Sequence, residues 1–170
     1  SKLSAESPMF VKMRSFQAVR VGDLEVTPFH KFHDAADPHS FVVQCGGVKV
    51  GVFTDIGRSC ENVINYFRQC HAVFLETNYD REMLENGRYP YFLKSRITNG
   101  NGHLSNDEAY ELFVRHRPSY MSHLFLSHIS KDNNDPSIIS SLFSKNPNGT
   151  KVILTSREQE IPVYNIEALA

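Results

Sequence analysis

The stretch that decides the fold is FVVQCGGVKVGVFTD, residues 41–55, in which two β-like runs flank the pair Gly46-Gly47. β-branched and aromatic residues dominate both runs, and such residues favour strands. Paired glycines supply the positive φ angles that a two-residue hairpin turn requires. The stretch therefore predicts an antiparallel hairpin that ends at Thr54 and Asp55.

Strands precede this hairpin, and helices and strands alternate after it. Upstream, residues 19–21 and 24–32 read as half-buried strands joined by a Gly-Asp turn. Downstream, Ser59 is predicted to cap a helix, Ser105 with Glu108 forms a capping box, and Asp135 begins a third helix. The remaining apolar runs are predicted strands, at residues 72–75, 121–126, 151–154 and 161–166. This order predicts an α/β protein with helices packed on the outside of a sheet or sheet pair.

Composition limits the class of protein. The chain has 170 residues, 41% of them hydrophobic and 22% charged, which argues against disorder and fits one domain. No apolar run reaches the roughly 18 residues of a membrane span, so no membrane partner is expected. The formal charge of −1 means that nucleic acid would have to bind through a local patch or bound metal. Three cysteines without CxxC spacing are expected to be buried, in a protein of the reducing cytoplasm.

Four polar clusters follow β-like runs or lie in glycine-bounded loops, at residues 30–34, 54–57, 102–106 and 127–132. A single histidine after a strand is more often structural than a ligand, and His30 and His39 are expected in nearby loops. Together, however, imidazole and carboxylate groups from separate strand ends are what a Zn²⁺ or Mn²⁺ site with open positions requires.

The order of these clusters resembles the metallo-β-lactamase superfamily, specifically its YycJ/WalJ-type branch of metal-dependent hydrolases and candidate exonucleases. The likeness runs from about Val26 to Leu142. It rests on HDAADP (33–38), TDIG (54–57), LETNYD (75–80), RYP (88–90) with Leu93-Lys94, GHLSN (102–106) and LSHISKDNN (126–134). The resemblance implies an αββα sandwich of sheets with outer helices, of which this chain would be the C-terminal part.

The resemblance also implies roles for individual residues. His33 and His128 would each bind one of two divalent ions, Zn²⁺ or Mn²⁺, and Asp55 would bridge the two ions. In the related RNase Z enzymes a glutamate orients a histidine that protonates the leaving oxygen. Glu76 and His103 stand at similar positions here, and we expect them to be the catalytic pair.

Substrate contacts are expected from residues near this pair. Arg88, Lys94 and Arg96 lie between Glu76 and His103 and are candidates to bind the phosphates of DNA or RNA, the Arg side chains through their bidentate forks. A solvated helical face is an equally good interpretation of these cations. Ser105 and Asn106, which follow His103, are also expected at the substrate. Tyr79 stands where the family has histidine.

The superfamily signature His-x-His-x-Asp-His is absent from this sequence. We therefore expect residues 1–170 to form a single, incomplete domain that is inactive alone, with partial or no metal occupancy. The full-length protein would be a phosphodiester hydrolase. The alternative is a non-catalytic binding or regulatory module on a degenerate scaffold. In the incomplete domain, sheet surface that the missing part would cover is expected to be exposed and to favour self-association.

Overall fold

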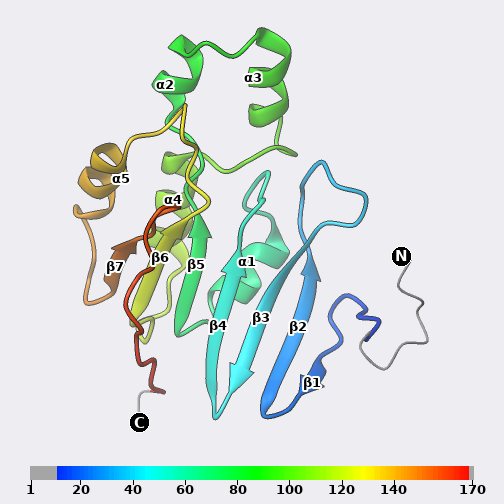
Figure 1. Ribbon diagram of the computed structural model, residues 1–170. Coiled ribbons are helices and arrows are strands. Elements are labelled where there is room, and N and C mark those ends of the chain that lie inside the picture. Colours follow the sequence, from blue (N-terminus) through cyan, green and yellow to red (C-terminus); the bar gives the residue numbers. More distant parts are fainter. Residues whose placement is uncertain (1–10, 169–170) are drawn as a thin grey trace.

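A computed structural model describes residues 11–168, which form a mixed sheet whose seven strands follow one another in chain order (Figure 1). The strands are β1 (Val19–Val21), β2 (Leu24–His30), β3 (His39–Cys45), β4 (Val48–Phe53), β5 (Ala72–Glu76), β6 (His123–Ser127) and β7 (Lys151–Leu154). Strands β1 to β4 pair antiparallel, whereas β4 to β7 pair parallel. The α/β class is thereby confirmed.

The predicted hairpin is present as β3 and β4. Cys45 pairs with Val48 across Gly46 and Gly47, whose φ angles are +53° and +84°. The strand predicted at residues 161–166 was wrong. The chain instead turns back across the sheet after β7, and the Tyr164 ring packs against Phe125 rather than extending the ladder. His30 and His39, expected in loops, are directly paired strand residues of β2 and β3.

Five helices occur among residues 11–168: α1 (Glu61–Phe67), α2 (Arg81–Asn86), α3 (Tyr91–Thr98), α4 (Asn106–His116) and α5 (Pro136–Phe143). The capping box of Ser105 and Glu108 at α4 and the Asp135 cap of α5 are confirmed. Ser59 does not cap α1, because Cys60 occupies the N-cap position and the Ser59 hydroxyl is buried without a hydrogen-bond partner. None of these helices combines the length and apolar character needed to cross a bilayer.

The main core lies on one face of the sheet, beneath α1, α4 and α5. Phe29, Phe53 and Leu75 from the strands and Phe67 and Phe113 from the helices are all fully buried there. Helices α2 and α3 instead lie beyond the end of the sheet (Figure 1). This arrangement leaves the loops at that end of the sheet free to build a site between the strand ends and α3.

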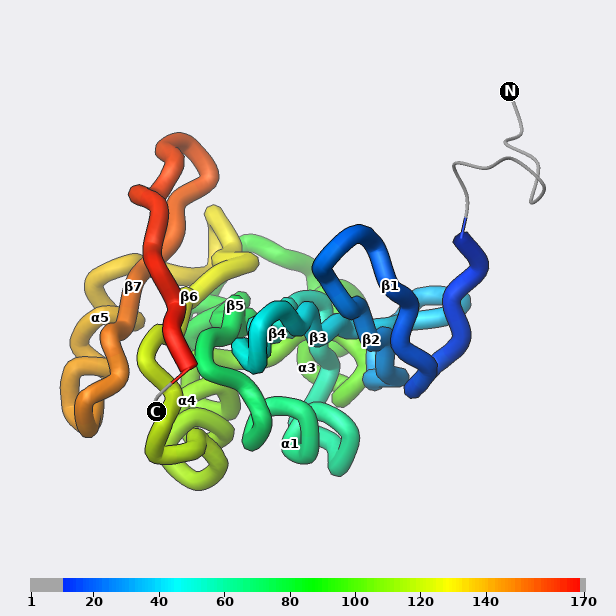
Figure 2. The backbone as a smooth tube through the Cα atoms, turned by 90° about the horizontal axis from the view of Figure 1, so that it is seen from below, coloured from blue at the N-terminus to red at the C-terminus, as the bar shows by residue number. Residues whose placement is uncertain are grey.

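Among residues 11–168, no helix lies on the opposite face of the sheet, and the segment that follows β7 crosses that face (Figure 2). Paired residues form an apolar row across it: Pro28, Phe41, Val52, Phe74, Phe125 and Ile153. We call this side the open face and the other the helix face.

The expectation that all three cysteines are buried was wrong, since Cys45 is exposed and Cys60 is half-buried. Cys70 alone of the three is buried, and burial raises the pKa of its thiol to about 12. Cys45 is exposed because it ends β3 beside the hairpin turn.

Candidate functional site

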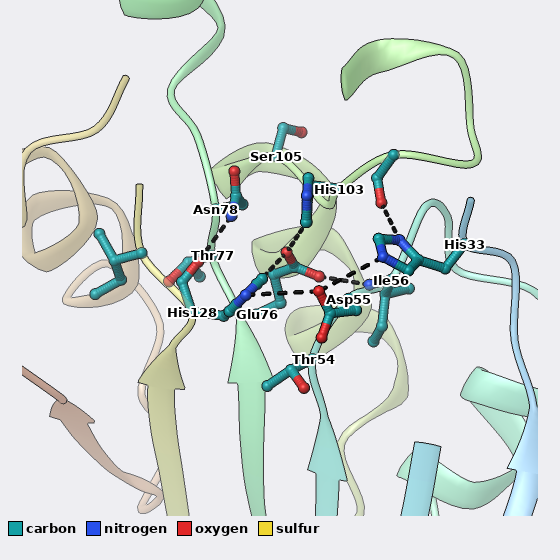
Figure 3. A network of polar contacts seen from close by, with 12 residues as sticks. His33, Thr54, Asp55, Ile56, Glu76, Thr77, Asn78, His103, Ser105 and His128 are labelled. Carbon is teal, nitrogen blue, oxygen red and sulfur yellow. Dashed lines mark hydrogen bonds and ion pairs between the residues drawn. The ribbon is translucent and has the colours of Figure 1, made fainter. Parts of the chain in front are cut away.

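The sequence-predicted ligands gather at the carboxyl ends of the parallel strands (Figure 3). Asp55 follows β4, Glu76 ends β5 and His128 follows β6. Because parallel strands end at the same edge of a sheet, these side chains converge there. His33 reaches the same place from the loop between β2 and β3, and His103 from the loop before α4.

Two of these residues have an unusual backbone conformation. Asp55 and His128 both have φ of +55°, in the left-handed region. This region costs a residue with a side chain about 1–2 kcal/mol, and such strain clusters at functional sites. Here it turns each side chain back over its strand end toward the common centre.

The carboxylate of Asp55 lies between two imidazoles. Its Oδ1 is 3.6 Å from Nε2 of His33 and 3.5 Å from Nε2 of His128. The Nδ1–H of His33 donates to the carbonyl of Gly102 at 2.8 Å, which leaves Nε2 with the lone pair that a metal needs. One carboxylate oxygen therefore lies between two imidazole nitrogens, and these are ligands that Zn²⁺ and Mn²⁺ accept. The candidate ligand atoms of His33, Asp55 and His103 also lie within 4.8 Å of one another.

Glu76 is fully buried and holds two histidines at once. Its Oε1 accepts from Nδ1 of His103 at 2.7 Å and from Nδ1 of His128 at 2.8 Å. Its Oε2 accepts from the backbone N–H of Ile56 at 2.5 Å. The hydrogen bond that His128 donates to Glu76 raises the pKa of His128, and burial opposes the shift. Sequence reasoning paired Glu76 with His103 and missed its bond to His128.

Lys31 is a cation at this site that sequence reasoning did not assign. Its ammonium donates to the carbonyl of Thr54, directly before Asp55. Burial lowers the pKa of Lys31, while the charges of Asp55 and Glu76 oppose that shift. Lys31 thus places a positive charge beside two carboxylates, and its position between His30 and His33 was the only signal for it in the sequence.

Gly102 and Gly57 are needed where two loops approach closely. A Cβ at Gly102 would lie 2.3 Å from the carbonyl oxygens of Arg96 and Ile97, at the end of α3. A Cβ at Gly57 would lie 2.4 Å from the carbonyl oxygen of Gly100. Only glycine avoids these clashes, so the two positions fix the loop that delivers His103.

The converging side chains line a cavity of about 390 Å³. The site residues that reach it are His33, Asp55, His103 and His128, together with Asp34, Asn78, Tyr89, Leu93, Arg96, Ile97, Gly102, Ser130, Asn133 and Arg157. Arg157 comes from the segment after β7, where no motif pointed to it. Arg96 is ion-paired with Asp34, and its hydrogen bond holds the pKa of that carboxyl below its usual range.

The other residues predicted to bind substrate do not line this cavity. Arg88 is exposed outside it, and Lys94 lies toward α2, where its ammonium donates to the carbonyl of Glu85. Ser105 is buried in the capping box of α4. Asn106 is buried too, and its side chain exchanges hydrogen bonds with that of Asn134.

No protein-family model matches the chain. The exodeoxyribonuclease YycJ of Bacillus anthracis is 34% identical to it over 113 residues, which is 66% of this chain and 43% of that protein. The crystal structure of the metallo-β-lactamase fold protein YhfI from Bacillus subtilis superposes with a TM-score of 0.61 at 12% identity, over 85% of this chain and 52% of YhfI. The chain is a metallo-β-lactamase-fold protein related to YycJ-type exodeoxyribonucleases.

A second structure agrees on the fold. Zn²⁺-bound PqqB from Methylobacterium extorquens superposes with a TM-score of 0.59 at 14% identity, over 84% of this chain and 49% of PqqB. The metallo-β-lactamase-fold chain thus spans less than half the length of the curated relative it matches and about half the length of these structures. The predicted fold and resemblance are confirmed. The roles of the individual site residues stay predictions.

Proposed function

We propose that this chain supplies part of a metal-dependent phosphodiesterase site that acts on DNA. The observation that carries the proposal is the position of Asp55 Oδ1 between Nε2 of His33 and Nε2 of His128, at 3.6 and 3.5 Å. The relationship to an exodeoxyribonuclease supports DNA, rather than RNA or a small ester, as the substrate.

The residues present fit divalent metal. His33 and His128 would each bind one ion through Nε2, and Asp55 would bridge the two ions. Divalent ions bound at such a site lower the pKa of a bound water and stabilise the charge of the scissile phosphate. Zn²⁺ and Mn²⁺ both suit this set of donors, and the structural relative PqqB binds Zn²⁺.

His103 is placed to serve the leaving group. Glu76 accepts from its Nδ1, which directs the other ring nitrogen away from Glu76, and the ring lines the cavity. A protonated Nε2 would donate its proton to the leaving 3′ or 5′ oxygen of the DNA. A positioned general acid of this kind contributes about 10²- to 10⁴-fold in rate.

The cavity also offers cationic groups for phosphate. Arg157 and Arg96 line it, with Tyr89 at the side formed by the α2–α3 connection. Arg88 and Lys94 lie outside the cavity and would contact only a part of the DNA strand that extends beyond the cavity. We assign Ser105 and Asn106 to holding α4 rather than to the substrate, because both are buried and hydrogen-bonded.

We further propose that this chain alone binds metal incompletely and does not hydrolyse DNA. It offers three ligands, and the signature His-x-His-x-Asp-His, which would supply most of a two-metal site, is absent from its sequence. Catalysis would then need ligands from elsewhere in the whole protein.

The test measures metal content and the release of nucleotides from end-labelled DNA by the whole protein with Zn²⁺ or Mn²⁺. Asp55→Ala is expected to abolish release and to remove the metal held at the cavity. His103→Gln is expected to slow release by about 10²- to 10⁴-fold with the metal content unchanged. His116→Gln, outside the site, is the matched control and is expected to change neither.

Two outcomes would contradict the proposal. Loss of metal in His103→Gln would make His103 a ligand rather than an acid. A whole protein without metal and without nuclease activity in either ion would favour the non-catalytic binding module.

A further inference from the structure

We propose that His30, Asp37 and His39 form a second divalent-metal site, separate from the cavity, at the base of the loop that carries His33. None of the three residues lines the cavity. Their ligand atoms all lie within 4.8 Å of one another. The proposal does not depend on the hydrolytic function, because binding of metal here requires only this chain's own side chains.

The strand register brings the two histidines together. His30 ends β2, His39 begins β3, and the two residues are direct partners in the antiparallel ladder. The next pair is joined by a hydrogen bond from the N–H of Lys31 to the carbonyl of Pro38 at 3.3 Å. His30 and His39 therefore form a non-hydrogen-bonded pair, the kind whose side chains lie closest. Their ring centroids are 4.3 Å apart.

Asp37 supplies the third ligand. Its Oδ1 lies 3.8 Å from Nδ1 of His30 and 3.6 Å from Nδ1 of His39. Zn–N and Zn–O bonds of about 2.0–2.1 Å in a tetrahedral site place the donors roughly 3.3 Å apart. The Asp37 oxygen therefore needs to move by only a few tenths of an ångström toward each imidazole. The Asp37 side chain is 73% exposed and that of His30 is 49% exposed, so both are free to make this shift.

Ser15 positions the least exposed ligand. Its hydroxyl oxygen lies 2.7 Å from Nε2 of His39. Without metal, the Nδ1–H of His39 donates to the carbonyl of Asp37 at 3.0 Å. When Nδ1 binds metal, the proton moves to Nε2 and is donated to Ser15, a second contact of the kind that fixes the ring orientation of metal-bound histidines. Two imidazoles and one carboxylate, with water in the fourth position, form a set that suits Zn²⁺.

Metal bound at this second site would also affect the cavity, because the two histidines flank the loop that carries His33. Residues 31–38 form the loop between the two histidines, and that loop carries His33, Asp34 and Lys31. Metal bound to His30 and His39 would tie the two ends of the loop together. It would thereby restrict His33, whose ring must stay beside Asp55.

The test is a Zn²⁺ titration of the chain carrying Asp55→Ala and His128→Ala, followed by calorimetry and, with Co²⁺, by the visible absorption of the ion. We expect one equivalent to bind in this background. Adding His30→Ala and His39→Ala should remove it, whereas adding His116→Ala and His123→Ala, which substitute two histidines outside both sites, should leave it. Circular dichroism checks that each variant is folded.

Two single substitutions keep the proposal falsifiable if the double variant unfolds. Asp37→Asn removes the charge of an exposed ligand and should weaken Zn²⁺ binding by about tenfold or more, since the amide is a poorer ligand than the carboxylate. Ser15→Ala should weaken binding by roughly 10–100-fold. Absence of a bound equivalent in the Asp55→Ala, His128→Ala background, or an equivalent that these substitutions leave unchanged, would overturn the proposal.

Discussion

The two faces of the sheet are built from the same strands and have different surroundings. On the helix face, Phe53 is fully buried beneath the helices. On the open face, its neighbour Val52 is 36% exposed, although it belongs to an apolar row that crosses six strands. The segment after β7 covers part of this row, where Tyr164 packs against Phe125.

The comparison shows that an apolar side chain in this sheet is not necessarily a buried one. Alternation along β4 places apolar side chains on both faces, and strands in parallel sheets are usually covered on both sides. The helices cover one face, and the αββα sandwich that the resemblance implies would place a second sheet against the other. The open face is therefore a surface suited to a further layer.

The largest expected effect is the loss in free energy of unfolding when a phenylalanine is removed from each face. Phe53→Ala should lower the free energy of unfolding by about 3–5 kcal/mol, because it leaves a cavity in a packed core. Phe74→Ala, in the row on the open face, should lower it by less than half as much, since Phe74 is half-buried and stacks on Phe125. Urea unfolding followed by circular dichroism measures both. Equal losses would show that the open face is covered as completely as the helix face in solution.

A second prediction concerns association of the chain with a second copy through the open face. An exposed apolar surface of this kind favours a partner, and we expect the mass measured by light scattering to rise with protein concentration. Val52→Lys should weaken the association by about tenfold or more, because it would bury an unpaired charge. Ile138→Lys is the matched control, since Ile138 is 37% exposed but lies on α5.

The self-association prediction fails in either of two ways. A mass that stays monomeric at high concentration would contradict it directly. Equal weakening by the two lysine substitutions would assign the association to general surface charge rather than to the open face.

Much of the helix face could be predicted from the sequence, because the signals are local. The turn at Gly46 and Gly47 and the capping box of Ser105 and Glu108 each depend on a few adjacent residues. The cap of α1 could not, since Ser59 and Cys60 are adjacent and tertiary packing decides which one begins the helix. The strand predicted at 161–166 failed for a similar reason: the Tyr164 ring there packs onto Phe125 of the open face instead of extending the ladder.

In the candidate site, too, the features with local sequence signals could be predicted and those set by tertiary structure could not. The resemblance pointed to Asp55, His103 and His128 because each lies in a recognisable motif. One oxygen of Glu76 accepts hydrogen bonds from both His103 and His128. That arrangement depends on the distances between strand ends, which no local sequence pattern reveals. Arg157 reaches the cavity only because the chain turns back after β7, so no motif could have indicated it.

The smallest expected effect is on the pH dependence of the free energy of unfolding, compared between one histidine on each face. Burial and then the charge of Arg68 lower the pKa of His116, on α4. Burial and then the charge of Lys151 lower the pKa of His123, on the open face beside Tyr164. A histidine with a lowered pKa binds a proton more readily in the unfolded chain, so its contribution to stability falls as pH drops below about 6.5.

The raised pKa of His128 has the opposite effect on the pH dependence of stability, so the whole chain shows only the sum. Substituting each histidine in turn isolates its own contribution. His116→Gln and His123→Gln should each reduce the loss of stability between pH 7 and pH 5, measured by urea unfolding. The outcome for His123 depends on the segment that covers it. If Tyr164 lifts away in solution, burial lowers the pKa of His123 by less while the charge of Lys151 remains, so His123→Gln reduces the loss by less than His116→Gln does. That result would mean that the open face is uncovered over β6 as well as over β4, and that the segment after β7 does not substitute for a second layer.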